Sequence, residues 1–273
     1  MLTANPDPAP TWENPLKKLL QEGKPVIGIT LTVGSAEIAA QAASLGFDFL
    51  WIEMEHSPIT LESLRDMVLA TRGLKAIPFA RVPVNTIWAA KRVLDVGVLG
   101  VMFPFTSTPD LARQAVAACK YPPHGRRGSG AGFAKFRWPT HESYYDFADQ
   151  NIMVVVIVEE AQALEEIDAI AATPGVDVIF VGTSDLAFSL GYRGRHDHPK
   201  VQEALKKVVA AGRAHHKILG APVADSSQVR KFMEQGFLFF QMTTELNLMA
   251  LGARQLLEPL GKAAPEPTKQ ALY

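Results

Sequence analysis

The sequence predicts an α/β protein built on a parallel sheet, and three features of the 273-residue chain support this prediction. Short apolar segments alternate with helical segments along most of the chain. The apolar segments are hydrophobic throughout, as expected for strands that are covered on both faces. Glycines precede the even-numbered strands by one or two residues, where a helix end needs a left-handed residue. These glycines are Gly46, Gly97, Gly175 and Gly236.

The elements follow one another in regular order. A short helix is expected at 15–22, before the first strand. The eight strands are predicted at 25–31, 47–53, 76–82, 98–103, 152–158, 176–181, 218–223 and 237–242. Helices are predicted between them at 36–45, 61–71, 87–94, 109–119, 161–172, 201–215 and 227–235, with a last helix at 246–257. The long segment 121–150 mixes Gly, Arg and aromatic residues, and its irregularity indicates function or a contact between subunits.

Eight β/α units in this length favour a closed (β/α)8 TIM barrel forming a single domain over residues 1–273. An open doubly wound sheet is the alternative, but no Gly-x-Gly-x-x-Gly follows the first strand. The ends of the chain, 1–14 and 262–273, are rich in Pro or polar residues, and we expect them to be loosely held tails.

Composition excludes several classes of function. A formal charge of −1 provides no basic field for nucleic acid or an anionic membrane. Cys119 is the only cysteine, so the chain has no intramolecular disulfide and no Cys-rich zinc site, and we expect Cys119 to be a packing residue. The N-terminal segment lacks a basic region followed by an apolar one, which favours a cytoplasmic protein.

Polar side chains gather at the carboxyl ends of the predicted strands, which meet at one mouth in such a barrel. Glu53, Glu55 and His56 follow the second strand. Burying carboxylates beside an imidazole is costly unless they are paired, hydrogen-bonded or bound to a metal. His56 is placed for general acid–base work, although a lone histidine is more often structural. Arg81 ends the third strand and either holds a substrate oxygen or pairs with Glu53 or Glu55.

The fifth and sixth strands end in Glu159 and Asp185, which neighbouring strands deliver side by side. Adjacent carboxylates repel each other unless one is protonated or a cation lies between them. A hard divalent ion such as Mg²⁺ or Mn²⁺ suits this all-oxygen site. The alternative is that either acid merely caps the following helix. Thr183 and Ser184 lead into that helix, whose first N–H groups are donors for a carboxylate.

Several ordered motifs carry a resemblance to a known family. They are Gly46-Phe47-Asp48, Glu55-His56, Arg81-Val82-Pro83, Leu94-Asp95-Val96-Gly97, Tyr121-Pro122-Pro123, Gly125, Arg127-Gly128, Glu159, Gly182 and Asp185-Leu186. On these motifs the sequence resembles the HpcH/HpaI aldolases over about 28–257. These metal-dependent class II enzymes cleave 4-hydroxy-2-oxo acids, such as 4-hydroxy-2-oxoheptanedioate, to pyruvate or a pyruvate analogue and an aldehyde.

The resemblance implies roles for the polar residues at the strand ends. Glu159 and Asp185 would ligate a divalent ion (Mg²⁺, Mn²⁺ or Co²⁺), which pyruvate chelates through its carboxylate and keto oxygens. Arg81 would stabilise the enolate oxygen, and the amides around Thr183 and Ser184 would hold the substrate carboxylate. Glu53 and Glu55 then become supporting residues that orient His56, Arg81 or metal-bound water. We expect Arg81→Ala to reduce turnover far more than stability.

The resemblance also implies an assembly. His56 paired with Asp95 would form the acid–base couple, and the family tends to form hexamers that exchange a C-terminal helix between subunits. Asp95 ends a helix before the fourth strand, so it lies at the other end of the barrel from His56. We therefore predict that these two residues meet across a subunit interface.

Two other functions remain open from the sequence. Decarboxylation of oxaloacetate-like acids passes through the same enolate, so it needs the same residues. A catalytically silent barrel that acts as a binding module is the second alternative. It would have no reason to keep Glu159, Asp185, Arg81 and His56 together, and this favours an enzyme.

Overall fold

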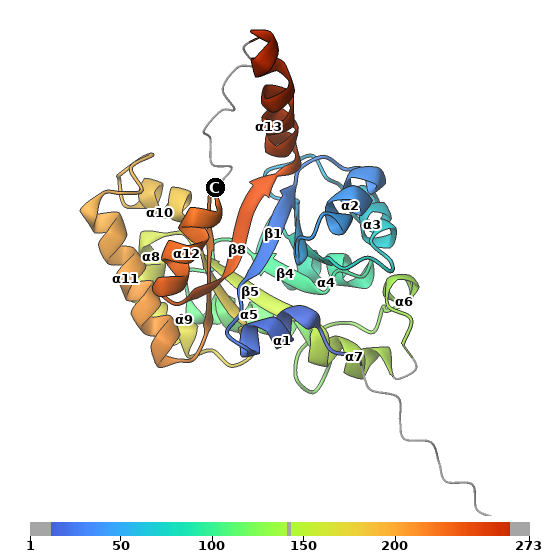
Figure 1. The fold of residues 1–273 in the computed structure, drawn as a ribbon. Helices are drawn as coiled ribbons and strands as arrows, with labels where there is room; N and C mark the ends of the chain where they lie inside the picture. The colour runs from blue at the N-terminus through green and yellow to red at the C-terminus, as the bar shows by residue number, and fades with distance from the viewer. Residues whose placement is uncertain (1–11, 141–142, 263–273) are drawn as a thin grey trace, which may run out of the picture.

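The protein, seen in a computed structural model that describes residues 12–140 and 143–262, is a closed barrel of eight parallel strands (Figure 1). Each strand pairs with the next along the chain, and β8 closes the barrel against β1. The predicted TIM barrel is therefore confirmed. The strands are β1 Val26–Leu31, β2 Phe49–Glu53, β3 Ile77–Arg81, β4 Gly100–Phe103, β5 Met153–Val158, β6 Val178–Val181, β7 Ile218–Pro222 and β8 Phe237–Thr244.

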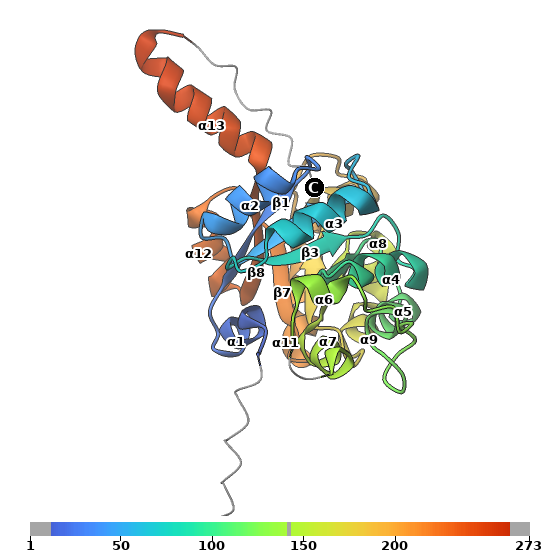
Figure 2. The same ribbon diagram turned by 90° about the vertical axis from the view of Figure 1, so that its right-hand side faces the viewer.

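Helices surround the barrel and connect its strands (Figure 2). They are α1 Pro15–Gln21, α2 Ala36–Ser44, α3 Leu61–Ala70, α4 Ile87–Asp95, α5 Pro109–Cys119, α6 Ala134–Arg137, α7 Tyr144–Asn151, α8 Ala161–Glu165, α9 Ile167–Ala171, α10 Thr183–Ser189, α11 Pro199–Ala214, α12 Ser226–Glu234 and α13 Glu245–Leu257, followed by the 3-10 turn η1 Glu258–Leu260. None of the helices in the described part of the chain is both long and apolar enough to cross a membrane.

The four glycines before the even-numbered strands all adopt positive φ angles. The angles are 104° at Gly46, 107° at Gly97, 85° at Gly175 and 97° at Gly236. Residues with a Cβ rarely adopt this conformation, so glycine here ends each helix and turns the chain into the strand. The repeat that indicated regular β/α units therefore has the structural basis that we predicted.

The segment 121–150 is more ordered than the sequence indicated. It contains α6 and α7, and Trp138 between them donates its indole N–H to the carbonyl of Gly97 at 2.7 Å. Aromatic residues that looked irregular in sequence pack as a cluster, with the rings of Trp12 and Trp138 5.1 Å apart. Periodicity missed these helices because they are short and α6 spans a single turn.

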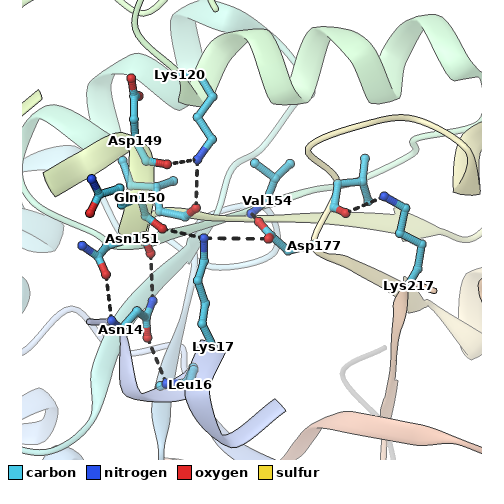
Figure 3. Close-up of polar contacts among 12 residues, drawn as sticks. Asn14, Leu16, Lys17, Lys120, Asp149, Gln150, Asn151, Val154, Asp177 and Lys217 are labelled. Carbon is cyan, nitrogen blue, oxygen red and sulfur yellow. Dashed lines mark hydrogen bonds and ion pairs between the residues drawn. The ribbon is translucent and has the colours of Figure 1, made fainter. Parts of the chain in front are cut away.

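Polar contacts join α1 to the end of α7 (Figure 3). Asn14 caps α1 and donates two hydrogen bonds to Asn151, from its backbone N–H at 2.7 Å and from its side-chain amide at 2.9 Å. Lys17 donates to the carbonyl of Gln150 at 2.7 Å. Residues 1–11 and 263–273 of the predicted tails lie outside the described residues, but Asn14 is fully buried and firmly held. The loose tail therefore does not extend to Asn14.

The last helix, α13, projects beyond the carboxyl end of β8 and away from the barrel in both views (Figures 1 and 2). It has no buried residue along its length. Several of its large apolar side chains are exposed: Leu246, Met249, Leu251 and Leu256. Within this chain α13 therefore has an apolar surface that the barrel does not cover.

Candidate active site at the carboxyl end of the barrel

Glu53 and Arg81 form a buried ion pair at the ends of β2 and β3. The strand register sets them directly opposite each other. The Nε of Arg81 donates to Oε2 of Glu53 at 2.7 Å, and both side chains are almost fully inaccessible to water. The indole of Trp51 donates to the same oxygen at 3.1 Å. The ion pair that we left open from the sequence is therefore formed.

Glu53 also organises the turn that follows β2. Its Oε1 accepts the backbone N–H groups of Glu55 at 2.7 Å and His56 at 2.9 Å. Oε2 of Glu55 lies 3.2 Å from Nε of Arg81, so Arg81 is held between two carboxylates. The predicted supporting role of Glu53 and Glu55 toward Arg81 agrees with these contacts. The arrangement fixes the guanidinium at the mouth of the barrel.

Glu55 and His56 differ in their exposure to water. The carboxylate of Glu55 is nearly buried, and burial raises its pKa to about 7 against the opposing effect of Arg81. The imidazole of His56 is about half exposed (48%), with Nε2 3.8 Å from Oε2 of Glu55. His56 therefore lies at the open mouth, where a bound molecule can reach a ring nitrogen.

Glu159 follows β5 and is a buried carboxylate with one backbone donor. Its Oε1 accepts the N–H of Phe105, which follows the neighbouring strand β4, at 2.7 Å. Burial raises the pKa of Glu159 to about 8, while the Phe105 N–H and Arg81 oppose this shift and Glu55 and Asp185 add to it. Glu55 and Asp185 thus act electrostatically on Glu159, and Arg81 is the cation that opposes them.

Asp185 lies in the first turn of α10, after β6. The residue at the N-cap position of α10 is Gly182, and the helix has no side-chain cap, nor does α8, which follows Glu159. The helix-capping alternative for Glu159 and Asp185 is therefore wrong. Thr183 and Ser184 are the first residues of α10, so their N–H groups precede the first intrahelical bond, which Leu186 donates to Gly182.

The donor set fits a hard divalent cation with an incomplete protein shell. Within residues 12–140 and 143–262, no three His, Cys, Asp or Glu side chains lie together so that they could hold an ion by themselves. Glu159 and Asp185 would therefore need water or substrate oxygens to complete the coordination, as catalytic Mg²⁺ sites commonly do. Burial and the neighbouring carboxylates raise the pKa of Glu159 although Arg81 opposes them, and a dication would add further positive charge beside it.

Asp95 is not part of this mouth within one chain. It is the last residue of α4, which runs from the carboxyl end of β3 back to the amino end of β4. Its carboxylate pairs with Nη2 of Arg127 at 3.2 Å. Burial raises the pKa of Asp95, and Arg127 opposes the shift. Asp95 therefore lies at the far end of α4 from the mouth, and its pairing with His56 across a subunit interface stays a prediction.

Two contacts at the mouth were missed by the sequence interpretation. Phe105 donates its backbone N–H to Glu159 and adopts a left-handed conformation with φ 47°. A phenylalanine in the sequence gives no sign of this conformation. Glu245, at the start of α13, accepts the N–H groups of Thr32 at 2.6 Å and Val33 at 2.7 Å. The start of the projecting helix is therefore bonded to the loop after β1.

Comparison with known proteins gives one consistent family. The sequence model described as HpcH/HpaI aldolase/citrate lyase matches residues 27–251. The hydroxypyruvate/pyruvate aldolase of Agrobacterium fabrum is 36% identical over 96% of this chain and 98% of its own length. The 5-keto-4-deoxy-D-glucarate aldolase of Shigella boydii is 32% identical over 93% of this chain and 98% of its own length.

A solved structure agrees with these relatives. The crystal structure of an HpcH/HpaI aldolase/citrate lyase family protein from Burkholderia cenocepacia superimposes with a TM-score of 0.83 at 34% identity. The match covers 91% of this chain and all of that one. The family model, which matches residues 27–251, runs from β1 to α13 and includes the residues at the polar mouth.

Proposed function

Because the chain belongs to the HpcH/HpaI aldolase/citrate lyase family and is an enzyme of the carbon–carbon lyase class, we propose that it is a metal-dependent class II aldolase. The reaction is the reversible cleavage of a 4-hydroxy-2-oxo acid to an aldehyde and pyruvate or a hydroxypyruvate-type acid. The observation that carries the proposal is the close grouping of buried Glu159, Asp185 and the ion-paired Arg81 at one mouth.

Glu159 and Asp185 would hold the divalent ion, Mg²⁺, Mn²⁺ or Co²⁺. When bound, the ion supplies Lewis-acid polarisation of the keto group of the substrate. The ionised form of Glu159 is disfavoured by burial and by the neighbouring carboxylates. A cation between Glu159 and Asp185 removes that penalty, so the residues are suited to the ion before substrate arrives.

Arg81 supplies fixed positive charge at the keto oxygen. Breaking the bond between C3 and C4 leaves an electron pair that spreads onto this oxygen, so negative charge develops there. Arg81 is held by Glu53 and Glu55 and therefore needs no reorganisation when that charge appears. The N–H groups of Thr183 and Ser184 would bind the carboxylate of the substrate.

His56 is the candidate group for proton transfer. Cleavage requires removal of the proton from the C4 hydroxyl, and the half-exposed imidazole can accept it. Asp95 of a second copy would orient the ring. Asp95 of the same chain cannot do so, because it is the last residue of α4 and lies at the amino end of the barrel, away from the mouth. The exposed apolar side chains of α13 support a homo-oligomer, for which we propose a hexamer that exchanges this helix.

The function is tested by assaying aldol cleavage and synthesis with pyruvate and hydroxypyruvate against a panel of aldehydes, with metal titrated. We expect activity that EDTA abolishes and Mn²⁺ or Mg²⁺ restores. Undiminished activity in excess EDTA would contradict the proposal. Release of carbon dioxide from oxaloacetate without any aldol product would instead identify a decarboxylase. Light scattering of the protein cut after Thr244 tests the role of α13, and an unchanged hexamer would refute helix exchange.

A further inference from the structure

We propose that Phe105 and Gly182 are positioning residues that clamp the carboxylate of Glu159 from its two sides. This inference rests on the proposed function, since it takes Glu159 as a metal ligand. Neither residue offers a side chain to the ion. Phe105 acts through its backbone N–H, and Gly182 acts through the space left by its missing Cβ.

The first side of the clamp is the amide of Phe105. It donates to Oε1 of Glu159 at 2.7 Å, a short bond to a buried carboxylate. Phe105 adopts φ 47°, a left-handed conformation that is unfavourable for a residue with a Cβ. Strained backbone conformations cluster at functional sites, where the surrounding structure holds them in place. Here the constraint is the direction in which the N–H points.

Thr106 keeps Phe105 in this conformation. Its N–H donates to the carbonyl of Ile157 at 3.0 Å, which ties the loop to β5, the strand that carries Glu159. Its hydroxyl donates to the carbonyl of Phe103 at 3.0 Å and accepts from Nδ2 of Asn85 at 3.1 Å. Thr106 is fully buried, so these bonds do not compete with water.

The second side of the clamp is Gly182. A Cβ at this position would lie 2.6 Å from Oε2 and 2.8 Å from Cβ of Glu159, closer than real side chains approach. The backbone at Gly182 has φ −75°, which any residue can adopt. Glycine is therefore required here by the close approach of Glu159 and not by the backbone conformation.

Together the two contacts fix the carboxylate before any ion binds. Oε1 is engaged by Phe105, and Oε2 lies against the end of β6, three residues before Asp185 in the chain. A ligand already held in its binding orientation loses less conformational freedom on coordination. Metal affinity should therefore depend on Phe105 and Gly182, although neither side chain contacts the metal. Replacing the hydrogen-bond partners of metal ligands commonly weakens metal binding in other proteins.

Calorimetric titration of the metal-free protein with MnCl₂ tests the clamp without relying on activity. Gly182→Ala should displace Glu159, and Thr106→Val should release the turn at Phe105. Each should weaken Mn²⁺ binding by roughly 10-fold to 100-fold. Gly252→Ala is the matched glycine control, because its Cβ would meet nothing within 4 Å. Thr173→Val likewise removes one buried hydroxyl bond, to the carbonyl of Ala169 at 3.1 Å, and should bind Mn²⁺ as the parent does.

The outcomes separate the clamp from the function on which it rests. Parent protein that binds Mn²⁺, with Gly182→Ala and Thr106→Val binding it equally well, overturns the clamp alone. Parent protein that binds no Mn²⁺ overturns both proposals. Circular dichroism confirms folding of each variant before titration. If Gly182→Ala does not fold, the Mn²⁺ affinity of Thr106→Val is compared with that of Thr173→Val, and equal affinities overturn the clamp.

Discussion

Replacing Arg81 by alanine removes the cation that the buried carboxylate of Glu53 pairs with. Glu53 keeps the indole N–H of Trp51 and two backbone N–H groups, but it loses its ion pair at 2.7 Å. Leaving one member of a buried pair uncompensated costs about 3–5 kcal/mol. Because neither side chain is exposed, no solvent screening reduces this cost. The expectation that Arg81→Ala reduces turnover far more than stability therefore does not agree with the buried ion pair.

A double variant separates the two roles of Arg81. In Arg81→Ala with Glu53→Gln, the uncompensated charge is gone, and we expect about 2 kcal/mol of the lost stability to return. Activity should not return, because the positive charge at the keto oxygen is still missing. Loss of one preorganised group of this kind typically lowers turnover by about 10²–10³-fold. Urea unfolding gives the stability, and pyruvate release at saturating Mn²⁺ gives the turnover.

The comparison has a clear refuting result. If the double variant regains both stability and turnover, Arg81 acts only as the partner of Glu53, and the catalytic role is wrong. If Arg81→Ala unfolds at the same urea concentration as the parent protein, the buried ion pair does not contribute the stability that its burial indicates. Arg81→Lys is a useful third variant, because it keeps the charge and loses the planar set of donors.

Three further predictions concern other parts of the molecule. With chelator present, the parent protein should lose stability relative to Glu159→Gln as the pH rises from about 4.5 to about 8. Burial raises the pKa of Glu159 in the folded state to about 8, so its ionisation disfavours the folded form. A stability difference between the two proteins that does not change with pH in urea unfolding would contradict this. Asn14→Ala should lower the free energy of unfolding by roughly 2–3 kcal/mol, through a lost cap and buried bonds, without changing Mn²⁺ affinity; weaker Mn²⁺ binding in calorimetry would contradict this. His56→Ala and Asp95→Ala should each be inactive alone. When the two are mixed and refolded together, roughly a quarter of the sites should combine an intact His56 from one chain with an intact Asp95 from another, and pyruvate release should return in that proportion. No return of activity would refute a site shared between subunits.

The sequence was sufficient for the barrel because every unit repeats the same physical pattern. Continuous apolar strands and a glycine before each even-numbered strand predict β/α units, and strand ends in a barrel converge by topology. Positions such as Glu53, Arg81 and Glu159 could therefore be assigned to one mouth from their place after a strand. The two helices within 121–150 escaped because they are too short for periodicity to reveal.

The details of the site depended on contacts that no local pattern encodes. The left-handed backbone of Phe105 is accompanied by two bonds from Thr106: a local one to Phe103 at the end of β4, and one to Ile157 of β5, which is far away in the sequence. The need for glycine at 182 arises only when Glu159 packs over the end of β6. Both are tertiary effects, and propensity gives no sign of them.

The central claim is that Glu159 and Asp185 hold the metal, and not the ionisable stretch Glu53 to His56. The most direct measurement is anomalous scattering from a crystal soaked with Mn²⁺ and pyruvate. We predict a manganese peak between the carboxylates of Glu159 and Asp185, with pyruvate reaching Arg81. A peak coordinated by Glu53, Glu55 or His56 instead would contradict the account.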